Sequence, residues 1–207
     1  MLQEEAYYRL ERAADPTNCH IYFVGGYCDI THRDYVQHWS PYGVYEEITM
    51  MEGADQCTTR VCEIIDTISA HVLYMGAKPC FATIPPASLE VWNNYRMNVR
   101  RVTNFLLHTH QYDDMQEMLI RAIMQINEHI SQINGTNDMA TPDLAGTVVE
   151  RREGRQTRIH YSRVWDGVHP EKNTRVQWAR KLQKAINRNR GYDSPIPTVE
   201  ELIALVG

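Results

Sequence analysis

The feature that most constrains the fold is an alternation of short apolar runs, which end at glycine or proline, with long amphipathic stretches. The run from His20 to Gly26 is rich in β-branched and aromatic residues, and a second run over 78–84 ends at Pro85-Pro86. Both runs are typical of buried strands. Residues 54–74 between them carry apolar side chains at helical spacing and end before Gly76. Strands separated by long helices predict a parallel sheet with helices on both faces.

The rest of the chain predicts further helices, one short strand and loops. Helices are expected over 1–13, 89–108, 113–133 and 172–190, a short strand within 154–161, a loop with one short element over 31–53, and a loop over 135–150. Thr198 and Glu201 have the spacing of a reciprocal N-terminal cap for a last helical turn. We therefore expect one domain over 1–190, with a three-layer α/β/α architecture and a mostly parallel sheet, followed by a C-terminal tail over 191–207 that contains a short helix.

The composition is that of a folded protein rather than of a disordered or membrane-spanning chain. Hydrophobic residues make up 43% and charged residues 23%. No apolar run approaches the roughly 20 residues that a bilayer span requires, and the opening residues lack the pattern of a secretory signal. The five cysteines form no C-x-x-C pair. These features favour a cytoplasmic or nuclear protein that is not secreted.

The charge is unevenly distributed along the chain. The net charge of −5 argues weakly against nucleic acid as a partner of the whole surface. The last third is nevertheless basic, and its positive residues include Arg151, Arg152, Arg155, Arg158, Arg163, Arg175, Arg180, Lys181, Lys184, Arg188 and Arg190. The simpler interpretation is the solvated face of a helix beside an exposed loop. Association with nucleic acid is the alternative.

One loop carries residues suited to acid–base chemistry, namely Asp166-Gly167-Val168-His169. A carboxylate three residues before an imidazole can accept a hydrogen bond from one ring nitrogen and leave the other free to act as a general base. Active sites in parallel sheets gather at strand ends, where Gly26, Cys28 and Asp29 also lie. The structural alternative is an aspartate that bonds backbone N–H groups and caps the following helix, with the histidine merely exposed.

These segments resemble a known family when they are taken together. Asp166-Gly167-Val168-His169-Pro170 before an amphipathic helix is similar to the last block of the SGNH (GDSL-type) hydrolases, whose D-x-x-H supplies the acid and the base. Residues 21–31 resemble the family's strand that runs into G-x-N-D, and residues 80–86 resemble the strand that follows. Within the family, the esterase-like domains encoded by the first reading frames of some LINE-type retrotransposons are the most similar. The resemblance implies an SGNH/flavodoxin-like fold and an acyl-ester substrate.

The chain departs from the family pattern at two positions that matter for catalysis. Residues 1–19, which precede the first predicted strand, contain no serine, so the Gly-Asp-Ser block with the family's nucleophile is missing and the domain is expected to be N-terminally truncated. Cys28 stands where the family has the asparagine that donates to the oxyanion. A thiol is a weak donor, and losing one such donor typically costs on the order of 100- to 1,000-fold in turnover.

Other candidate groups have simpler interpretations. Cys28 could pair with His169 as a nucleophile, but we expect a buried, inert thiol. The serines weighed as nucleophiles, Ser40, Ser69, Ser88 and Ser131, are expected to be caps or surface hydroxyls, and no ligand group for a metal is evident. Trp165 could line a substrate cleft, although packing in the core is the simpler expectation.

The sequence therefore predicts an esterase- or acetylhydrolase-like domain that is degenerate and inactive as it stands. In it, Asp166 and His169 are the catalytic residues, Gly26, Cys28 and Asp29 line the oxyanion side of the cleft, and no cofactor or metal is expected. The alternative is a non-catalytic interaction or assembly domain of a retroelement-derived protein that associates with nucleic acid. Without the usual first strand, the sheet is expected to have an exposed edge, through which two copies of the chain could associate.

Overall fold

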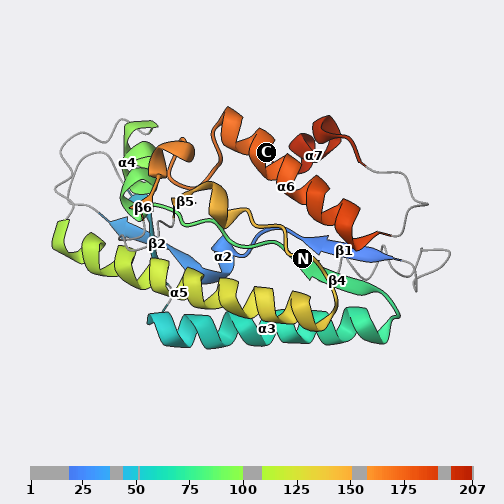
Figure 1. Ribbon diagram of the computed structural model, residues 1–207. Helices are drawn as coiled ribbons and strands as arrows, with labels where there is room; N and C mark the ends of the chain where they lie inside the picture. The colour runs from blue at the N-terminus through green and yellow to red at the C-terminus, as the bar shows by residue number, and fades with distance from the viewer. Residues whose placement is uncertain are drawn as a thin grey trace.

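The computed structural model describes residues 19–37, 44–50, 52–99, 109–150, 158–190 and 197–206. These residues form a mixed α/β protein that is mostly helical (Figure 1). The elements are β1 (His20–Phe23), α2 (Tyr27–Ile30), β2 (Thr31–Gln37), β3 (Val44–Met50), α3 (Ala54–Tyr74), β4 (Lys78–Phe81), α4 (Leu89–Val99), α5 (Thr109–Thr136), η2 (Ala145–Thr147), β5 (Val149–Glu150), β6 (Arg158–Ile159), η3 (Tyr161–Arg163), α6 (Lys172–Asn189) and α7 (Val199–Val206).

Strands β1 and β4 pair in parallel, as the sequence predicted, with His20 opposite Lys78 and Phe23 opposite Phe81. The pair is packed against helices through alternate side chains, because successive residues of a strand point to opposite faces. Phe23 packs against the core formed by α3 and α5, whereas Tyr22 packs against α6 and α7. In Figure 1, α3 and α5 accordingly lie on one side of the pair and α6 and α7 on the other.

The outer edge of β4, and the extended chain after it, are covered by side-chain amides of α5. Asn134 accepts the N–H of Phe81 at 2.9 Å and donates to the carbonyl of Phe81 at 2.7 Å. Asn127 pairs with both groups of Ile84 in the same way, at 2.7 and 2.8 Å. The side chain of Gln116 accepts the N–H of Leu89 and donates to the carbonyl of Ala87. Residues 116, 127 and 134 share one face of α5, so this helix takes the hydrogen-bonding place of a neighbouring strand.

The prediction of a loop over 31–53 was wrong, because β2 and β3 form an antiparallel hairpin there. Its register runs from Thr31 opposite Met50 to Gln37 opposite Val44. The two segments contain strand-forming residues, but charged residues interrupt their alternation and hid the period of two. A further amide fastens the hairpin to α4, since Asn93 accepts the N–H of Ile48 at 2.8 Å and donates to its carbonyl at 3.0 Å.

The described strands do not merge into the single, mostly parallel sheet that was expected. They form three two-stranded sheets, of which β1–β4 is parallel and β2–β3 and β5–β6 are antiparallel. Within the described ranges, β4 is the only strand that pairs with β1. Hydrogen-bonding groups on the other edge of β1 therefore have no strand partner among these residues.

The long predicted helices over 54–74 and 172–190 correspond to α3 and α6, and the one over 113–133 lies within the longer α5. The predicted helix over 89–108 is seen as α4 up to Val99, while residues 100–108 and the predicted helix over 1–13 lie outside the described residues. The predicted cap of the last helix is confirmed. The backbone N–H of Thr198 donates to the Glu201 carboxylate at 2.7 Å, and the N–H of Glu201 donates to Thr198 Oγ1 at 3.2 Å. None of the described helices is long and apolar enough to cross a membrane.

Candidate functional site

The Asp166 loop is a tight turn that is closed at its base. Val164 and Pro170 form an antiparallel bridge, and the N–H of Trp165 donates to the carbonyl of His169 at 3.0 Å. Gly167 at the tip has a φ of +93°, and a Cβ there would lie 2.6 Å from the carbonyl oxygen of Ser88 and 2.7 Å from the backbone nitrogen of Trp92. Only glycine combines this conformation with so close a backbone approach. The loop is therefore held rigidly against the start of α4.

Asp166 and His169 are in direct contact within this loop. Asp166 Oδ2 lies 2.6 Å from His169 Nδ1, while Oδ1 accepts the N–H groups of Val168 at 3.0 Å and of His169 at 2.7 Å. The carboxylate is buried, with 2% of its side chain exposed, whereas half of the imidazole is exposed. An ionised carboxylate can only accept, so Nδ1 carries the proton and the lone pair of Nε2 remains available to an outside group.

The geometry agrees in part with each of the two interpretations that the sequence left open, an aspartate that orients the histidine and an aspartate that bonds backbone N–H groups. Asp166 does bond backbone N–H groups, as the structural alternative held, but it also orients the imidazole. It does not cap the following helix, because Glu171 occupies the N-cap position of α6 and makes no side-chain cap. The aspartate thus has a structural and a chemical role at once.

Aromatic side chains surround the imidazole. The centroid of the buried Trp92 ring lies 5.6 Å from that of the His169 ring. The centroids of the Trp165 and His169 rings are 6.2 Å apart, and the planes of these two rings differ by 28°. Trp165 is 52% exposed, so the expectation that it belongs to the core was wrong. The bridge across the loop explains the exposure, because it buries Val164 and Asp166 on either side and turns the side chain between them outward.

The glycine turn after β1 forms the second half of the candidate site. Gly25 and Gly26 have φ values of +151° and +108°, and a Cβ on Gly26 would lie 2.7 Å from Ile84 Cδ1. The single helical turn α2 follows, in which Tyr27 and Ile30 point inward and the two residues between them are exposed. Cys28 is one of these exposed residues, so the prediction of a buried thiol was wrong.

Tyr27 links the two halves of the site, although sequence reasoning overlooked it. Burial raises the pKa of its phenol, and the negative charge of Asp166 raises it further. Its hydroxyl is buried and has no hydrogen-bond partner within the described residues. Tyr27 lies three residues before the buried Ile30, and residues at this spacing share one face of a helix. This spacing is the sequence signal that could have identified Tyr27 as an inward-facing residue.

The described residues bring no serine hydroxyl into a hydrogen bond with His169. Ser88 Oγ accepts the N–H of Val91 at 3.2 Å and so caps α4, while the backbone N–H of Ser88 donates to the carbonyl of Gly167 at 2.8 Å. Ser69 is bonded to Asn137, and Ser131 to its own helix. Ser162, which the sequence analysis left out, is exposed on η3, and Ser40 lies outside the described residues. The expectation of caps or surface hydroxyls is confirmed for Ser88, which caps α4, and for Ser131, which is exposed, but it was wrong for Ser69, which is buried within α3 and accepts Asn137 Nδ2.

The other predicted site residues are not joined to the imidazole either. Within the part of the chain that the structure describes, no hydrogen bond links Gly26, Cys28 or Asp29 to His169. The carbonyl of Asp29 instead accepts Arg60 Nη2 at 2.6 Å. Among the same residues, no group of three or more His, Cys, Asp or Glu side chains could hold a metal ion.

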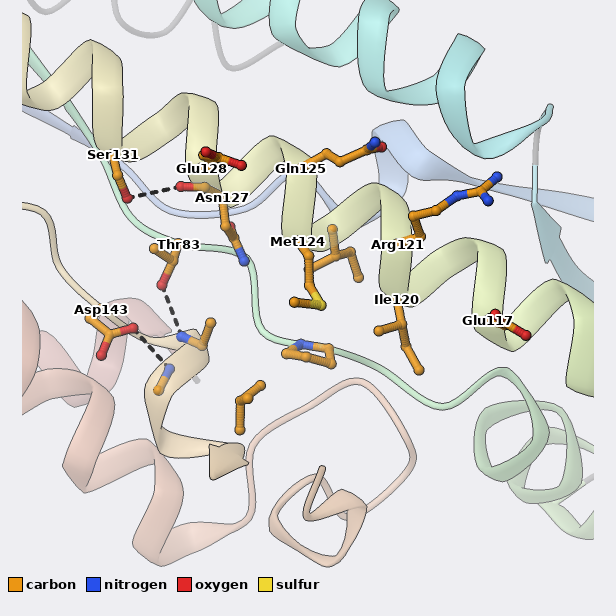
Figure 2. A pocket seen from close by; sticks show the side chains of 15 residues that line it. Thr83, Glu117, Ile120, Arg121, Met124, Gln125, Asn127, Glu128, Ser131 and Asp143 are labelled. Carbon is orange, nitrogen blue, oxygen red and sulfur yellow. Dashed lines mark hydrogen bonds between the residues drawn. The ribbon is translucent and has the colours of Figure 1, made fainter. Parts of the chain in front are cut away.

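A hollow lies away from this site, between α5 and the segment that contains η2 (Figure 2). It has a volume of about 1130 Å³, and Ile120 and Met124 of α5 point into it. Two of its polar side chains are engaged, because Thr83 accepts the N–H of Ala145 and Asp143 accepts that of Gly146, both at 2.9 Å. No histidine or cysteine is among the residues that line it.

Comparisons of the chain with protein-family models, with curated proteins and with solved structures gave no match. Function therefore has to be inferred from the site itself. Its strongest element is the pair formed by the buried Asp166 and the exposed His169. Such a pair can withdraw a proton from a hydroxyl or a water placed at Nε2.

Proposed function

We propose that this chain is a degenerate esterase-type domain of the SGNH hydrolase kind, which keeps the acid–base pair and lacks the nucleophile. The observation that carries the proposal is the 2.6 Å contact between Asp166 Oδ2 and His169 Nδ1, with the carboxylate buried and the imidazole half exposed. A carboxylate in this position fixes the imidazole tautomer and stabilises the imidazolium that forms during acyl transfer. The ancestral substrate class is an acyl ester, and no cofactor takes part.

The arrangement of the elements supports the same proposal. The parallel pair β1–β4, with α3 and α5 on one side and α6 and α7 on the other, fits a three-layer α/β/α domain that has lost strands. Gly25 and Gly26 follow the carboxyl end of β1, where open α/β sheets place their active sites. The esterase-like domains of LINE-type retroelements remain the proposed relatives, and the cytoplasm or nucleus the proposed location.

The chemistry that such a site can still perform is limited. His169 can accept a proton, but none of the described serines is bonded to it. Cys28, which the resemblance aligns with the oxyanion donor, is exposed, and a thiol donates weakly. Loss of one such donor costs about 100- to 1,000-fold in turnover, and loss of the nucleophile costs still more. We therefore expect no measurable ester hydrolysis by the chain as it stands.

Hydrolysis of a short-chain nitrophenyl ester tests this expectation. The unmodified chain should release nitrophenol no faster than the His169→Ala variant, since an imidazole without a nucleophile has nothing to activate. A Cys28→Ser variant serves as the matched control, because Cys28 is the exposed thiol of the site. Turnover that depends on both His169 and Cys28 would show that a cysteine nucleophile is at work and would overturn the proposal.

The imidazole tautomer tests the retained half of the site independently of activity. Nitrogen NMR at a pH where the ring is neutral should show His169 protonated at Nδ1, with the signal altered by Asp166→Asn. His129 is a matched internal control, because it meets Asp66 through Nε2 at 2.7 Å and should show the opposite tautomer. A His169 ring protonated at Nε2 would contradict the proposed acid–base role.

One observation also favours a second role, that of a non-catalytic interaction domain associated with nucleic acid. Arg180, Lys184 and Arg188 are all exposed and lie on successive turns of α6, which gives this helix a basic stripe. Fluorescence anisotropy with single-stranded RNA at low salt tests this role. Binding should weaken when the three residues are replaced by glutamate, and an unchanged affinity would exclude the stripe as the binding surface.

A further inference from the structure

Trp165 exposes a large aromatic surface directly beside the imidazole of the candidate site. Its side chain is 52% exposed, although indoles bury more apolar area than most side chains when they pack. The ring planes of Trp165 and His169 differ by 28°, with 6.2 Å between the ring centroids. A flat group that lay on the indole would therefore reach the neighbourhood of His169.

The indole is held in place rather than free to turn. The ring of Tyr95 meets it edge to face, at 4.9 Å between centroids and 87° between planes. The backbone N–H of Trp165 is bonded to the carbonyl of His169, inside the bridge that closes the loop. Behind the imidazole lies Trp92, which is buried. A rigid, exposed aromatic surface loses little conformational entropy when a ligand covers it.

The surroundings indicate which kind of ligand fits this surface. The carboxylate of Asp166 offers little to a positive group, because it is buried and already accepts three hydrogen bonds. A sugar ring requires polar side chains around its hydroxyls, whereas the exposed Val91 near Gly167 and the half-buried Tyr95 beside Trp165 offer mainly apolar surface. A neutral aromatic ring requires only a π-face and an aromatic edge, and both are present.

We propose that Trp165 and His169 form a stacking platform for ligands that carry a flat, neutral aromatic ring. The ring lies on the exposed face of Trp165, and a carbonyl group attached to it points toward His169 Nε2. The inference that the natural ligand is an aryl or arylacyl ester rests on the proposed function. Stacking of an aromatic ring on Trp165 is independent of that function, because it requires no nucleophile.

Matched neutral probes test the platform in the full-length chain. Phenylacetamide carries an aromatic ring and a carbonyl group that is not hydrolysed, cyclohexylacetamide has a similar size without the π-face, and methyl glucoside represents sugars. Each is titrated while NMR follows the indole signal of Trp165 and the ring signals of His169. Phenylacetamide should shift both residues and bind more tightly than either other probe.

Variants then locate the binding surface. Trp165→Ala should weaken phenylacetamide binding by about fivefold or more, the order found for aromatic pairs, and Trp165→Phe should restore part of it. Tyr74→Ala is the matched control, because Tyr74 is 90% exposed on α3 and should have no effect. The His169 ring signals remain as the readout in the Trp165 variants.

The outcomes separate this inference from the proposed function. Equal binding of cyclohexylacetamide, tighter binding of methyl glucoside, or an affinity unchanged by Trp165→Ala would each overturn the aromatic platform. Failure of binding with His169 still protonated at Nδ1 would overturn this inference alone. Stacking that persists in a protein with the opposite His169 tautomer would instead overturn the proposed acid–base role and leave the platform intact.

Discussion

The Asp166 loop and the glycine turn after β1 are the two halves of one candidate site, yet they differ in how many hydrogen bonds hold their side chains and in how exposed these side chains are. In the loop, a buried carboxylate accepts three hydrogen bonds and a bridge closes the base. In the turn, Asp29 and Cys28 are exposed, and the inward packing rests on Tyr27 and Ile30. The half with the carboxylate and the imidazole is fastened by hydrogen bonds, whereas the turn leaves its two central side chains exposed.

If the proposed function is correct, the difference shows how a catalytic motif can persist after its activity is lost. Asp166 satisfies the N–H groups of Val168 and His169, so the folded structure requires it whether or not a substrate is present. An exposed side chain such as Cys28 has no comparable structural task. A D-x-x-H loop is therefore better evidence for a fold than for present catalysis.

Alanine at one positive-φ glycine in each half, Gly167 in the loop and Gly26 in the turn, gives the largest expected effect and tests the comparison directly. Gly167→Ala should lower the free energy of unfolding by about 3 kcal/mol, because the new Cβ meets backbone atoms of Ser88 and Trp92 that cannot move aside. Gly26→Ala should cost only about 1–2 kcal/mol, because its Cβ meets the flexible end of Ile84. Urea unfolding measures both.

Gly135→Ala is the control for these two variants, since it lies in α5 with nothing within 4 Å of the added Cβ. It should be neutral or stabilising by up to about 1 kcal/mol. A cost at Gly26 equal to that at Gly167 would remove the contrast in rigidity between the two halves.

The two aspartates form the next matched pair. Asp166→Ala should destabilise the protein by about 2–3 kcal/mol, because it leaves two backbone N–H groups and the imidazole Nδ1 without their acceptor. Asp29→Ala should change stability by less than about 0.5 kcal/mol, because its carboxylate is exposed and makes no hydrogen bond within the described residues. Thermal unfolding at neutral pH distinguishes them, and equal losses would contradict the contrast.

Periodicity in the sequence predicted the helices well and the irregular strands poorly. The apolar stripe of α3 and the basic, amphipathic pattern of α6 span many turns, so local spacing alone identified them. The β2–β3 hairpin was missed because its charged residues conceal the alternation. The amide pairs that fasten the chain after β4 to α5 were also beyond reach. Asn134 and Phe81 are 53 residues apart, so a local sequence pattern does not predict their contact.

The site was predictable only where its partners are adjacent in sequence. Asp166 and His169 lie in one loop, and their contact follows from their spacing. The exposure of Cys28 depends on the phase of a single helical turn, and that of Trp165 on a bridge between Val164 and Pro170. Residue type alone indicates the opposite for both, because cysteine and tryptophan are usually well buried.

Tyr27 provides the smallest expected effect and the most direct test of how the two halves meet. Its hydroxyl is buried and unpaired within the described residues, and a buried polar group without a partner opposes folding. Tyr27→Phe removes that group and keeps the ring, so it should leave stability unchanged or raise it by up to about 1 kcal/mol in urea unfolding. Tyr22→Phe is the control, because the Tyr22 hydroxyl accepts Asn189 Nδ2 at 2.9 Å and its loss should lower stability by about 1 kcal/mol. A comparable loss of stability in Tyr27→Phe would show that the Tyr27 hydroxyl does have a hydrogen-bond partner. The glycine turn would then be held by a hydrogen bond of its own, which would weaken the contrast between the two halves.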